Sequence, residues 1–241
     1  MTMIEPISVD VRSRQIVRLP ARRHLVLCPA IDDTAAFKAL RLMSVRSGVE
    51  DVAFVALKDV ERQGFIKTIN SAFKDADADL VSYVAQDAFA GVEWLAYMEA
   101  QFQSAKVNFA AYNCGKWNGR IAAFGCARTS WVRQLYAGDF FYPNYISHRA
   151  DNELTVIARG QDCFSFDPRS LLVEVDFEKP FRSKEDGASN FHVEDRETFE
   201  RRFSEGFDGL VEMPALAKLK PEYLKQKKSL WERGKRLLGG T

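Results

Sequence analysis

The sequence contains the stretch Asp79-Leu80-Val81-Ser82-Tyr83-Val84-Ala85-Gln86-Asp87-Ala88-Phe89-Ala90-Gly91. Its apolar run from Leu80 to Ala85 predicts a buried strand, because β-prone residues lie between an acidic cluster and a glycine. Asp87 follows this run. In an open α/β sheet the ligand crevice lies outside the carboxyl ends of the strands, so a carboxylate there could hold a divalent metal on a phosphate ligand. The alternative is that Asp87 only caps a helix expected to begin near Gly91.

Two earlier segments repeat this strand pattern. The runs Leu25 to Ala30 and Asp51 to Leu57 are continuously apolar, which is typical of buried strands. Helical spacing of apolar residues predicts helices over residues 35–46 and 64–73, between the strands. Strand, helix, strand, helix and strand in succession indicate right-handed βαβ units and a parallel sheet. The sequence therefore predicts an α/β fold with a mostly parallel central sheet flanked by helices.

The remaining chain adds less regular elements around this core. We expect helices over 92–103, 128–135 and 194–207, and strands over 108–112 and 171–177. Residues 121–124 form an apolar run that Gly125 is expected to break. Residues 1–23, which are rich in arginine, are expected to form an irregular or partly ordered N-terminal arm. Residues 24–213 would then form the domain, and residues 214–241 a helical C-terminal extension.

This C-terminal extension is basic and amphipathic. From Leu216 onward, lysine and arginine greatly outnumber Glu222 and Glu232, and Trp231 and several leucines supply apolar anchors. A basic helix with a tryptophan can lie on an anionic membrane surface. The alternative is a helix docked on the domain with a solvated basic face.

Composition narrows the class of protein. The 241 residues are 46% hydrophobic with a net charge of +1, so the chain can bury a sizeable core and has no charge excess that would suggest nucleic-acid binding. No apolar run approaches the ~20 residues of a membrane span, and the N-terminus lacks a secretory signal. The four cysteines form no CxxC pair, which argues against a zinc site. A cytoplasmic protein is the simplest account.

The predicted strand ends form one side of a crevice. Because the carboxyl ends of parallel strands meet at one edge of the sheet, a nucleotide could lie there. The chain has no GxGxxG or Walker-type loop, so a dinucleotide site or P-loop is not supported. The side chains expected at this edge are Pro29, Ala30 and Asp32 after the first strand, Lys58 and Asp59 after the second, and Asp87 after the third.

A second candidate site is the segment from His148 to Leu154. Asp151 and Glu153 lie two residues apart at the start of a predicted helix, so they cannot face the same direction. One could face the crevice while the other supports capping or the fold. A carboxylate in the crevice could accept a proton from an attacking hydroxyl. The alternative is an ordinary capped helix start.

The order of these segments resembles that of a small GT-A glycosyltransferase and is most similar to glycosyltransferase family 2. The similarity covers about residues 24–160. The residues that carry it are the proline-containing end of the first strand (25–30), the helix with an asparagine before the third strand (64–70), the DXD-type motif after that strand (84–89), and the later acidic motif that opens a helix (150–154).

The resemblance implies transfer of a sugar, with inversion, from a nucleotide-diphosphate sugar to a hydroxyl of a glycan or lipid-linked acceptor. It implies Asp151 as the general base, Asp87 at the metal and diphosphate site, and Mn²⁺ or Mg²⁺ as the cofactor. Because the motif has a single carboxylate, the metal could be held by Asp87 with the diphosphate and water, or together with His148 or His192. The donor contacts that it implies are Pro29, Ala30, Asp32, Lys58, Asp59, Asn70, Gln86 and Asp87. Candidates for acceptor or diphosphate contacts are Lys116, Trp117, Arg120 and Glu153.

The acidic motif departs from the family pattern, because Gln86 and Ala88 flank the single carboxylate of Asp87. This departure keeps open a second hypothesis, a non-catalytic GT-A-like domain that binds a nucleotide-sugar or scaffolds a glycan-assembly complex. A nucleotidyltransferase is a third hypothesis. It is weaker, because residues 31–34 lack the glycine-rich and basic loop that such an enzyme would usually have after its first strand.

Overall fold

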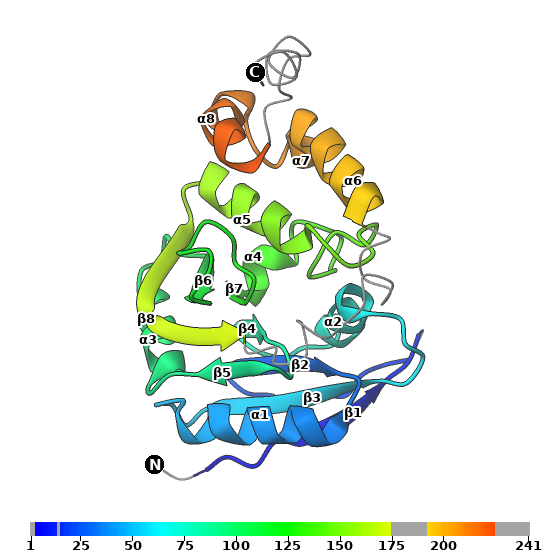
Figure 1. Ribbon diagram of the computed structural model, residues 1–241, viewed down its shortest axis with the longest axis vertical. Helices are drawn as coiled ribbons and strands as arrows, with labels where there is room; N and C mark the ends of the chain where they lie inside the picture. Colours follow the sequence, from blue (N-terminus) through cyan, green and yellow to red (C-terminus); the bar gives the residue numbers. More distant parts are fainter. Residues whose placement is uncertain (1–2, 14, 175–191, 225–241) are drawn as a thin grey trace, which may run out of the picture.

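The computed structural model describes residues 3–13, 15–174 and 192–224 as an α/β molecule with a helical layer at one end (Figure 1). Its elements, in chain order, are β1 (Ile7–Val11), β2 (His24–Ala30), α1 (Asp33–Val45), β3 (Val52–Asp59), α2 (Phe65–Phe73), β4 (Leu80–Tyr83), β5 (Ala88–Ala90), α3 (Trp94–Gln101), β6 (Phe109–Asn113), β7 (Gly125–Arg128), α4 (Thr129–Val132), α5 (Ala150–Gly160), β8 (Phe164–Glu174), α6 (His192–Ser204), α7 (Gly206–Gly209) and α8 (Met213–Tyr223).

The sheet has the strand order β1-β3-β2-β4-β7-β6-β8-β5. Strands β1, β3, β2 and β4 are mutually parallel neighbours, and β6 pairs in parallel with β8. The antiparallel pairs are β4 with β7, β6 with β7, and β5 with β8. The prediction of a mostly parallel central sheet flanked by helices is therefore confirmed. The reversal of direction after β4 leaves its carboxyl end next to the loops that carry the candidate site.

The central strands are buried on both faces, which explains their continuous apolar runs. In β2, Leu25 and Leu27 pack into one core, and Val26 and Cys28 pack into the other. Helices α1 and α3 cover the second face, and α2 and α5 cover the first, with α6–α8 beyond α5 (Figure 1). The strand period of two thus divides each strand between two helical layers.

The N-terminal arm is more ordered than predicted. Residues 7–11 form β1, which extends the sheet beyond β3, and Val11 is fully buried. The arginines and irregular spacing around this segment obscured a short edge strand. Edge strands need only one buried face and so carry a weaker apolar signal.

Two predictions on the β7 side of the sheet were also wrong. Gly125 was expected to break the apolar run 121–124, but strand β7 begins at this glycine. A Cβ on Gly125 would lie 2.8 Å from the hydroxyl oxygen of Tyr83 and 2.9 Å from the Phe109 ring, so tight packing requires glycine in this strand. Of the expected helix 128–135, only the four residues of α4 are helical.

Other parts of the chain show three further differences from the prediction. Strand β8 starts at Phe164, seven residues earlier than predicted, and residues 175–177 of the predicted strand lie outside the described residues. Helix α6 ends at Ser204, because Gly206 and Phe207 adopt positive φ angles of 72° and 52°. A short strand, β5, lies where none was predicted.

Part of the predicted C-terminal helix is present as α8. Pro214 lies in its first turn, where a proline fits because its missing N–H would be unpaired in any case. Residues 225–241, which contain most of the predicted basic extension, lie outside the described residues. Among the helices that the structure does describe, none has both the length and the apolar character needed to cross a membrane.

Candidate active site

A cleft of about 510 Å³ lies where the ends of the central strands meet the start of α5. Its walls come from the segment after β4, the loop after β6, the start of α5, the end of β8 and the start of α6. The structure brings together four predicted site residues in this cleft: Asp87, Trp117, His148 and Asp151. The alternative metal ligand His192 lies there too, and the cleft adds charged or titratable residues that the sequence did not single out for it: Tyr83, Arg149 and Glu174.

Asp87 lies in a turn just beyond β4, between that strand and β5. Helix α3 begins at Trp94 with Glu93 as its N-cap, so the alternative that Asp87 caps this helix is wrong. Burial, and to a lesser extent the negative charge of Asp87, raise the pKa of the Cys28 thiol on β2 to about 12. Asp87 is thus held at the end of the central strands and lines the cleft.

Gln86 connects the ends of two strands. Its side-chain carbonyl accepts hydrogen bonds from the backbone N–H groups of Ile31, at 3.1 Å, and Asp32, at 3.3 Å. These residues follow β2, whereas Gln86 follows β4. An acidic side chain could accept the same bonds, but here a neutral amide does so. Gln86 therefore fixes the turn that carries Asp87 and does not itself line the cleft.

Asp151 lies in the first turn of α5 and faces the cleft. One carboxylate oxygen accepts a hydrogen bond from the backbone N–H of Asn152 at 2.8 Å. Burial raises the pKa of the Asp151 carboxyl, although this hydrogen bond and the positive charge of Arg149 oppose the shift. The N-cap of α5 is Arg149, with no side-chain capping bond, so this is not an ordinary capped helix start.

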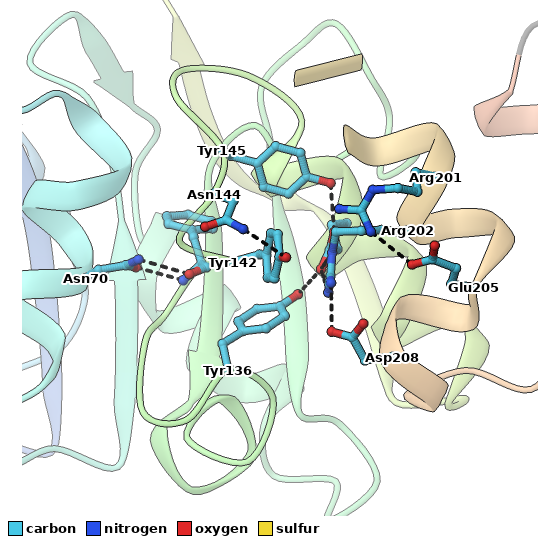
Figure 2. Close-up of polar contacts among 11 residues, drawn as sticks. Asn70, Tyr136, Tyr142, Asn144, Tyr145, Arg201, Arg202, Glu205 and Asp208 are labelled. Carbon is cyan, nitrogen blue, oxygen red and sulfur yellow. Dashed lines mark hydrogen bonds and ion pairs between the residues drawn. The ribbon is translucent and has the colours of Figure 1, made fainter. Parts of the chain in front are cut away.

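Glu153 is buried outside the cleft wall, in a network with Tyr136, Tyr145 and Arg202, which are labelled in Figure 2. Its oxygens accept hydrogen bonds from the hydroxyls of Tyr136 at 2.8 Å and Tyr145 at 2.7 Å, and from the guanidinium of Arg202 at 2.7 to 3.1 Å. The prediction that Asp151 and Glu153 face different directions is confirmed. Glu153 was also a candidate acceptor or diphosphate contact; its oxygens bind internal partners instead, and it takes no part in the function proposed below.

The predicted donor residues after β2 and β3 lie beside the cleft and not in its wall. Asp32 caps α1, accepting from the backbone N–H of Thr34 at 2.8 Å. Lys58 pairs with Asp33 at 3.1 Å. These residues form one continuous edge, because Ala30 is in register with Lys58. Pro29 and Ala30 are part of β2 itself, where Ala30 is buried.

Two other predicted donor residues mainly organise backbone. The carboxylate of Asp59 accepts hydrogen bonds from the N–H groups of Gln63, at 3.0 Å, and Gly64, at 2.8 Å, just before α2. The buried Asn70 amide donates to the carbonyl of Phe141 at 2.9 Å and accepts from its N–H at 2.8 Å (Figure 2). Asn70 thus fixes the backbone of Phe141, and Phe141 lines the cleft.

The loop after β6 places two cations around Trp117. Lys116 Nζ lies 5.2 Å and Arg120 Cζ 5.9 Å from the centroid of the indole. Trp117 lines the cleft, whereas Lys116 and Arg120 are exposed beside it. Cations stacked on a tryptophan at the edge of a cleft can add positive charge without entering it.

Two histidines lie together in the cleft. The rings of His148 and His192 are 5.0 Å apart between centroids. Across residues 3–224, as far as the structure describes them, no three His, Cys, Asp or Glu side chains converge as a metal site. A divalent ion that is bound through substrate phosphates needs only one or two protein carboxylates. The donor set here, with Asp87 as the oxygen ligand and His148 as a nitrogen ligand, fits a metal that a diphosphate helps to hold.

Comparisons with known proteins place this geometry in a known fold. No family model and no curated protein sequence matches the chain. Its structure matches a solved structure of S. aureus TarS with a TM-score of 0.61 and 12% identity, covering 86% of this chain and 44% of that one. It also matches the mannosyltransferase PcManGT from Pyrobaculum calidifontis, solved with GDP-Man and Mn²⁺, with a TM-score of 0.52 and 13% identity over 91% of this chain and 85% of that one. The chain has a GT-A fold.

The GT-A fold confirms the fold implied by the motif order. Membership of family 2 stays a prediction, since identities of 12–13% support the fold alone. In this GT-A fold, Asp87 and Asp151 come from the two acidic motifs that carried the resemblance, and both line one cleft. The chain spans less than half of the TarS chain that it matches, so the activity of that whole protein does not transfer to it.

Proposed function

We propose that the protein is an inverting glycosyltransferase that moves a sugar from a nucleotide-diphosphate sugar to a hydroxyl of a glycan or lipid-linked acceptor. One observation carries this proposal: the carboxylates of Asp87 and Asp151, from segments 64 residues apart in the chain, line the same cleft of a GT-A fold. The solved mannosyltransferase with the same fold was crystallised with GDP-Man and Mn²⁺, which supports a nucleotide-sugar donor here.

Asp151 is the general base in this proposal. It accepts the proton of the acceptor hydroxyl as that oxygen forms a bond to the anomeric carbon of the donor. The bond from the same carbon to the diphosphate oxygen breaks, and its electron pair leaves with the nucleoside diphosphate. Because attack and departure occur on opposite faces of the carbon, the configuration inverts. Burial of Asp151 favours this role, since a raised pKa makes its carboxylate a stronger base.

The diphosphate would lie on the Asp87 side of the cleft. Asp87 and His148 would hold Mn²⁺ or Mg²⁺ with oxygens of the diphosphate, and the ion would offset the charge of the leaving group. Arg149 lines the same cleft, and Lys116 and Arg120 lie at its edge around Trp117. These cations would attract the anionic donor. The edge formed by Pro29, Ala30, Asp32, Lys58 and Asp59, next to the Gln86 bridge, would bind the nucleoside.

A non-catalytic nucleotide-sugar-binding domain is the second candidate. The single carboxylate of the first acidic motif favours it, together with the lack of a three-ligand metal set within the described part of the chain. This candidate predicts binding of a nucleotide-sugar without turnover. The proposed cytoplasmic location, and an attachment of the basic C-terminal extension to an anionic membrane, apply to either candidate.

One assay separates the two candidates. The protein is incubated with a panel of UDP-, GDP- and dTDP-sugars and Mn²⁺ or Mg²⁺, and release of nucleoside diphosphate is measured alongside thermal unfolding. A ligand present at a concentration 100 times its Kd stabilises the folded protein by about 2.7 kcal/mol. A catalytic protein gives both a thermal shift and product, and a binding domain gives the shift alone. A protein that shows neither with any donor would contradict both candidates.

A further inference from the structure

Helix α6 carries two buried charged residues on a largely polar helix. Asp195 and Arg202 are each only 1% exposed, whereas Arg196, Glu200 and Arg201 on the same helix are exposed. The two residues are seven positions apart, which is about two helical turns, so they share one face. A buried charge is costly unless it is paired and hydrogen-bonded. Their partners therefore show what this face of α6 holds.

Asp195 forms hydrogen bonds with the loop that precedes α5. Its carboxylate accepts three backbone N–H hydrogen bonds, from Ile146 at 2.8 Å, Ser147 at 2.9 Å and His148 at 2.7 Å. A carboxylate that accepts several backbone N–H groups fixes those peptides strongly, because each bond is charge-assisted. The loop so fixed enters the cleft wall at Ser147 and His148.

Arg202 forms an ion pair with Glu153 on α5 itself. It donates to both carboxylate oxygens of Glu153, at 2.7 to 3.1 Å, and its guanidinium lies 3.4 Å from the centroid of the Tyr142 ring. A further bond of 2.7 Å runs from its other terminal nitrogen to Asp208 (Figure 2). Glu153 is only two residues beyond Asp151, so Arg202 fixes the same helical turn from its opposite side.

The backbone between the loop that Asp195 binds and the helical turn that Arg202 binds is strained. Arg149 has a φ angle of 71° and a ψ angle of −11°, in the left-handed region that non-glycine residues seldom adopt. Such a conformation persists only where its surroundings impose it. The Asp195 bonds hold the peptides before Arg149, and the Arg202–Glu153 pair holds the helix after it. Asp151 lies between the two points of attachment.

We propose that Asp195 and Arg202 are positioning residues, which hold Asp151 at the cleft by fixing the loop before it and the helix after it. This inference rests on the proposed glycosyl transfer with Asp151 as base. It assigns to α6 a role in the reaction, although neither Asp195 nor Arg202 lines the cleft. Arg202 holds the helix that carries Asp151, so its loss should affect turnover and not donor affinity. Asp195 also holds the peptide of His148, which the proposed function places at the metal, so its loss should affect both turnover and diphosphate affinity.

The test compares Asp195→Asn and Arg202→Lys with Arg201→Lys in the full chain. Arg201 is the matched control, because it is the neighbour of Arg202 and forms an exposed pair with Glu205 at 3.0 Å. We expect Asp195→Asn and Arg202→Lys to lower kcat by about tenfold to a hundredfold, as small misplacements of a catalytic group do. In Arg202→Lys the KM for the donor and the Kd for the nucleoside diphosphate should stay within about twofold of wild type, whereas Asp195→Asn should also weaken binding of the nucleoside diphosphate, because it loosens the His148 peptide. Arg201→Lys should match wild type in every measurement.

Hydrogen–deuterium exchange supplies a readout that does not depend on activity. In Asp195→Asn the amides of residues 146–148 should exchange faster, while those of β2 and β4 keep their protection. If these amides stay protected, or if they lose protection while kcat equals that of the control, the inference is wrong. If Arg202→Lys does not fold, Asp195→Asn alone decides. A wild-type protein that transfers no sugar would overturn the proposed function first, and this inference with it.

Discussion

Asp151, the proposed general base, lies where an ionised carboxylate has a cost in stability. Its carboxylate is half-buried, yet as a base it must be ionised, and burial disfavours the ionised form. We predict that Asp151→Asn lowers transfer by about 10² to 10⁴-fold, the usual contribution of a general base. The same substitution should raise the thermal unfolding temperature at pH 7, because the neutral amide removes a desolvated charge and its oxygen can still accept the N–H of Asn152.

The stability gained in Asp151→Asn should depend on pH, because folding and proton binding at Asp151 are coupled. The folded-state pKa of Asp151 is raised, so the folded state binds the proton more tightly than the unfolded state, and stability falls as pH rises through the folded-state pKa. The advantage of Asp151→Asn should therefore be largest at neutral pH and vanish below the ordinary pKa of an aspartate. Unfolding curves across this range check it, with the exposed Asp77→Asn as control. Full transfer activity in Asp151→Asn would rule out the base assignment.

The rate of transfer should also depend on pH through Asp151. A base with a raised pKa loses its proton-accepting form at a higher pH than an ordinary aspartate, so we predict that the acidic limb of the kcat/KM profile lies above the usual carboxyl range. His148 and Arg149 oppose the shift, which keeps this limb below the level that burial alone would give. A profile that is flat down to the ordinary pKa of an aspartate would contradict the prediction.

Asp87 is the residue on which the metal hypothesis depends. We predict that Asp87→Asn weakens binding of a nucleoside diphosphate in Mn²⁺ by at least about tenfold, or about 1.4 kcal/mol. Chelation with EDTA should weaken binding to the wild type in the same way and add little to the variant. Calorimetric titration measures both effects, and the exposed Asp79→Asn is a control from the same stretch. Equal affinities in all four measurements would remove Asp87 from the diphosphate site.

Between elements, the Glu153–Arg202 pair joins α5 to α6. Both side chains are only 1% exposed, so removing one leaves a buried charge with only its remaining partners, Asp208 for Arg202 and two tyrosine hydroxyls for Glu153. We predict that Glu153→Leu or Arg202→Met alone lowers the free energy of unfolding by about 3 to 5 kcal/mol, and that the double variant loses much less than the sum. Urea unfolding measures this cycle. The exposed Arg201–Glu205 pair, treated in the same way, should change stability by less than about 1 kcal/mol. Additive losses in the buried pair would contradict the prediction.

The sequence predicted those elements whose signal is local. Strands β2, β3 and β4 are continuous apolar runs, because helices cover both of their faces, and α1 and α2 show a clear helical period between them. Strand β7 could not be found in this way. Its first residue is a glycine that is required by Tyr83 and Phe109, which are distant in sequence. Its role in the sheet becomes visible only when the fold is assembled.

The contrast between local signals and contacts of distant residues also explains which site residues could be predicted. Asp87 and Asp151 were predictable, because strand ends and helix starts converge at one edge of such a sheet. The partners of Asn70, Asp59 and Glu153 were not, since backbone groups and distant side chains satisfy them and no spacing rule encodes such contacts. Asp195 was hidden for a further reason: it is one of several acidic residues on a polar helix, and only burial distinguishes it.

At the scale of the whole molecule, charge is distributed unevenly along the chain. Residues 225–241, which lie outside the described residues, contain six lysines and arginines and one glutamate, a net charge of +5. The whole chain has 34 basic and 33 acidic residues, so the remaining 224 residues carry 28 and 32, a net charge of −4. An overall charge near zero therefore conceals a basic extension on an acidic body. Such an extension can hold a protein at an anionic surface that its body would avoid.

We predict that the full chain floats with vesicles that contain anionic lipid and not with neutral vesicles. Each basic residue close to such a surface contributes about 1 kcal/mol, so replacing Lys225, Lys227 and Lys228 by glutamine should weaken binding by about 3 kcal/mol, or more than a hundredfold. Replacing Lys218 and Lys220, which are exposed on α8, is the matched control and should have a smaller effect. Added salt should release the wild type, because the attraction between exposed charges is screened. If flotation is equal for anionic and neutral vesicles, or survives loss of the three lysines, the extension does not bind membranes, and a lipid-linked acceptor loses its support relative to a soluble glycan.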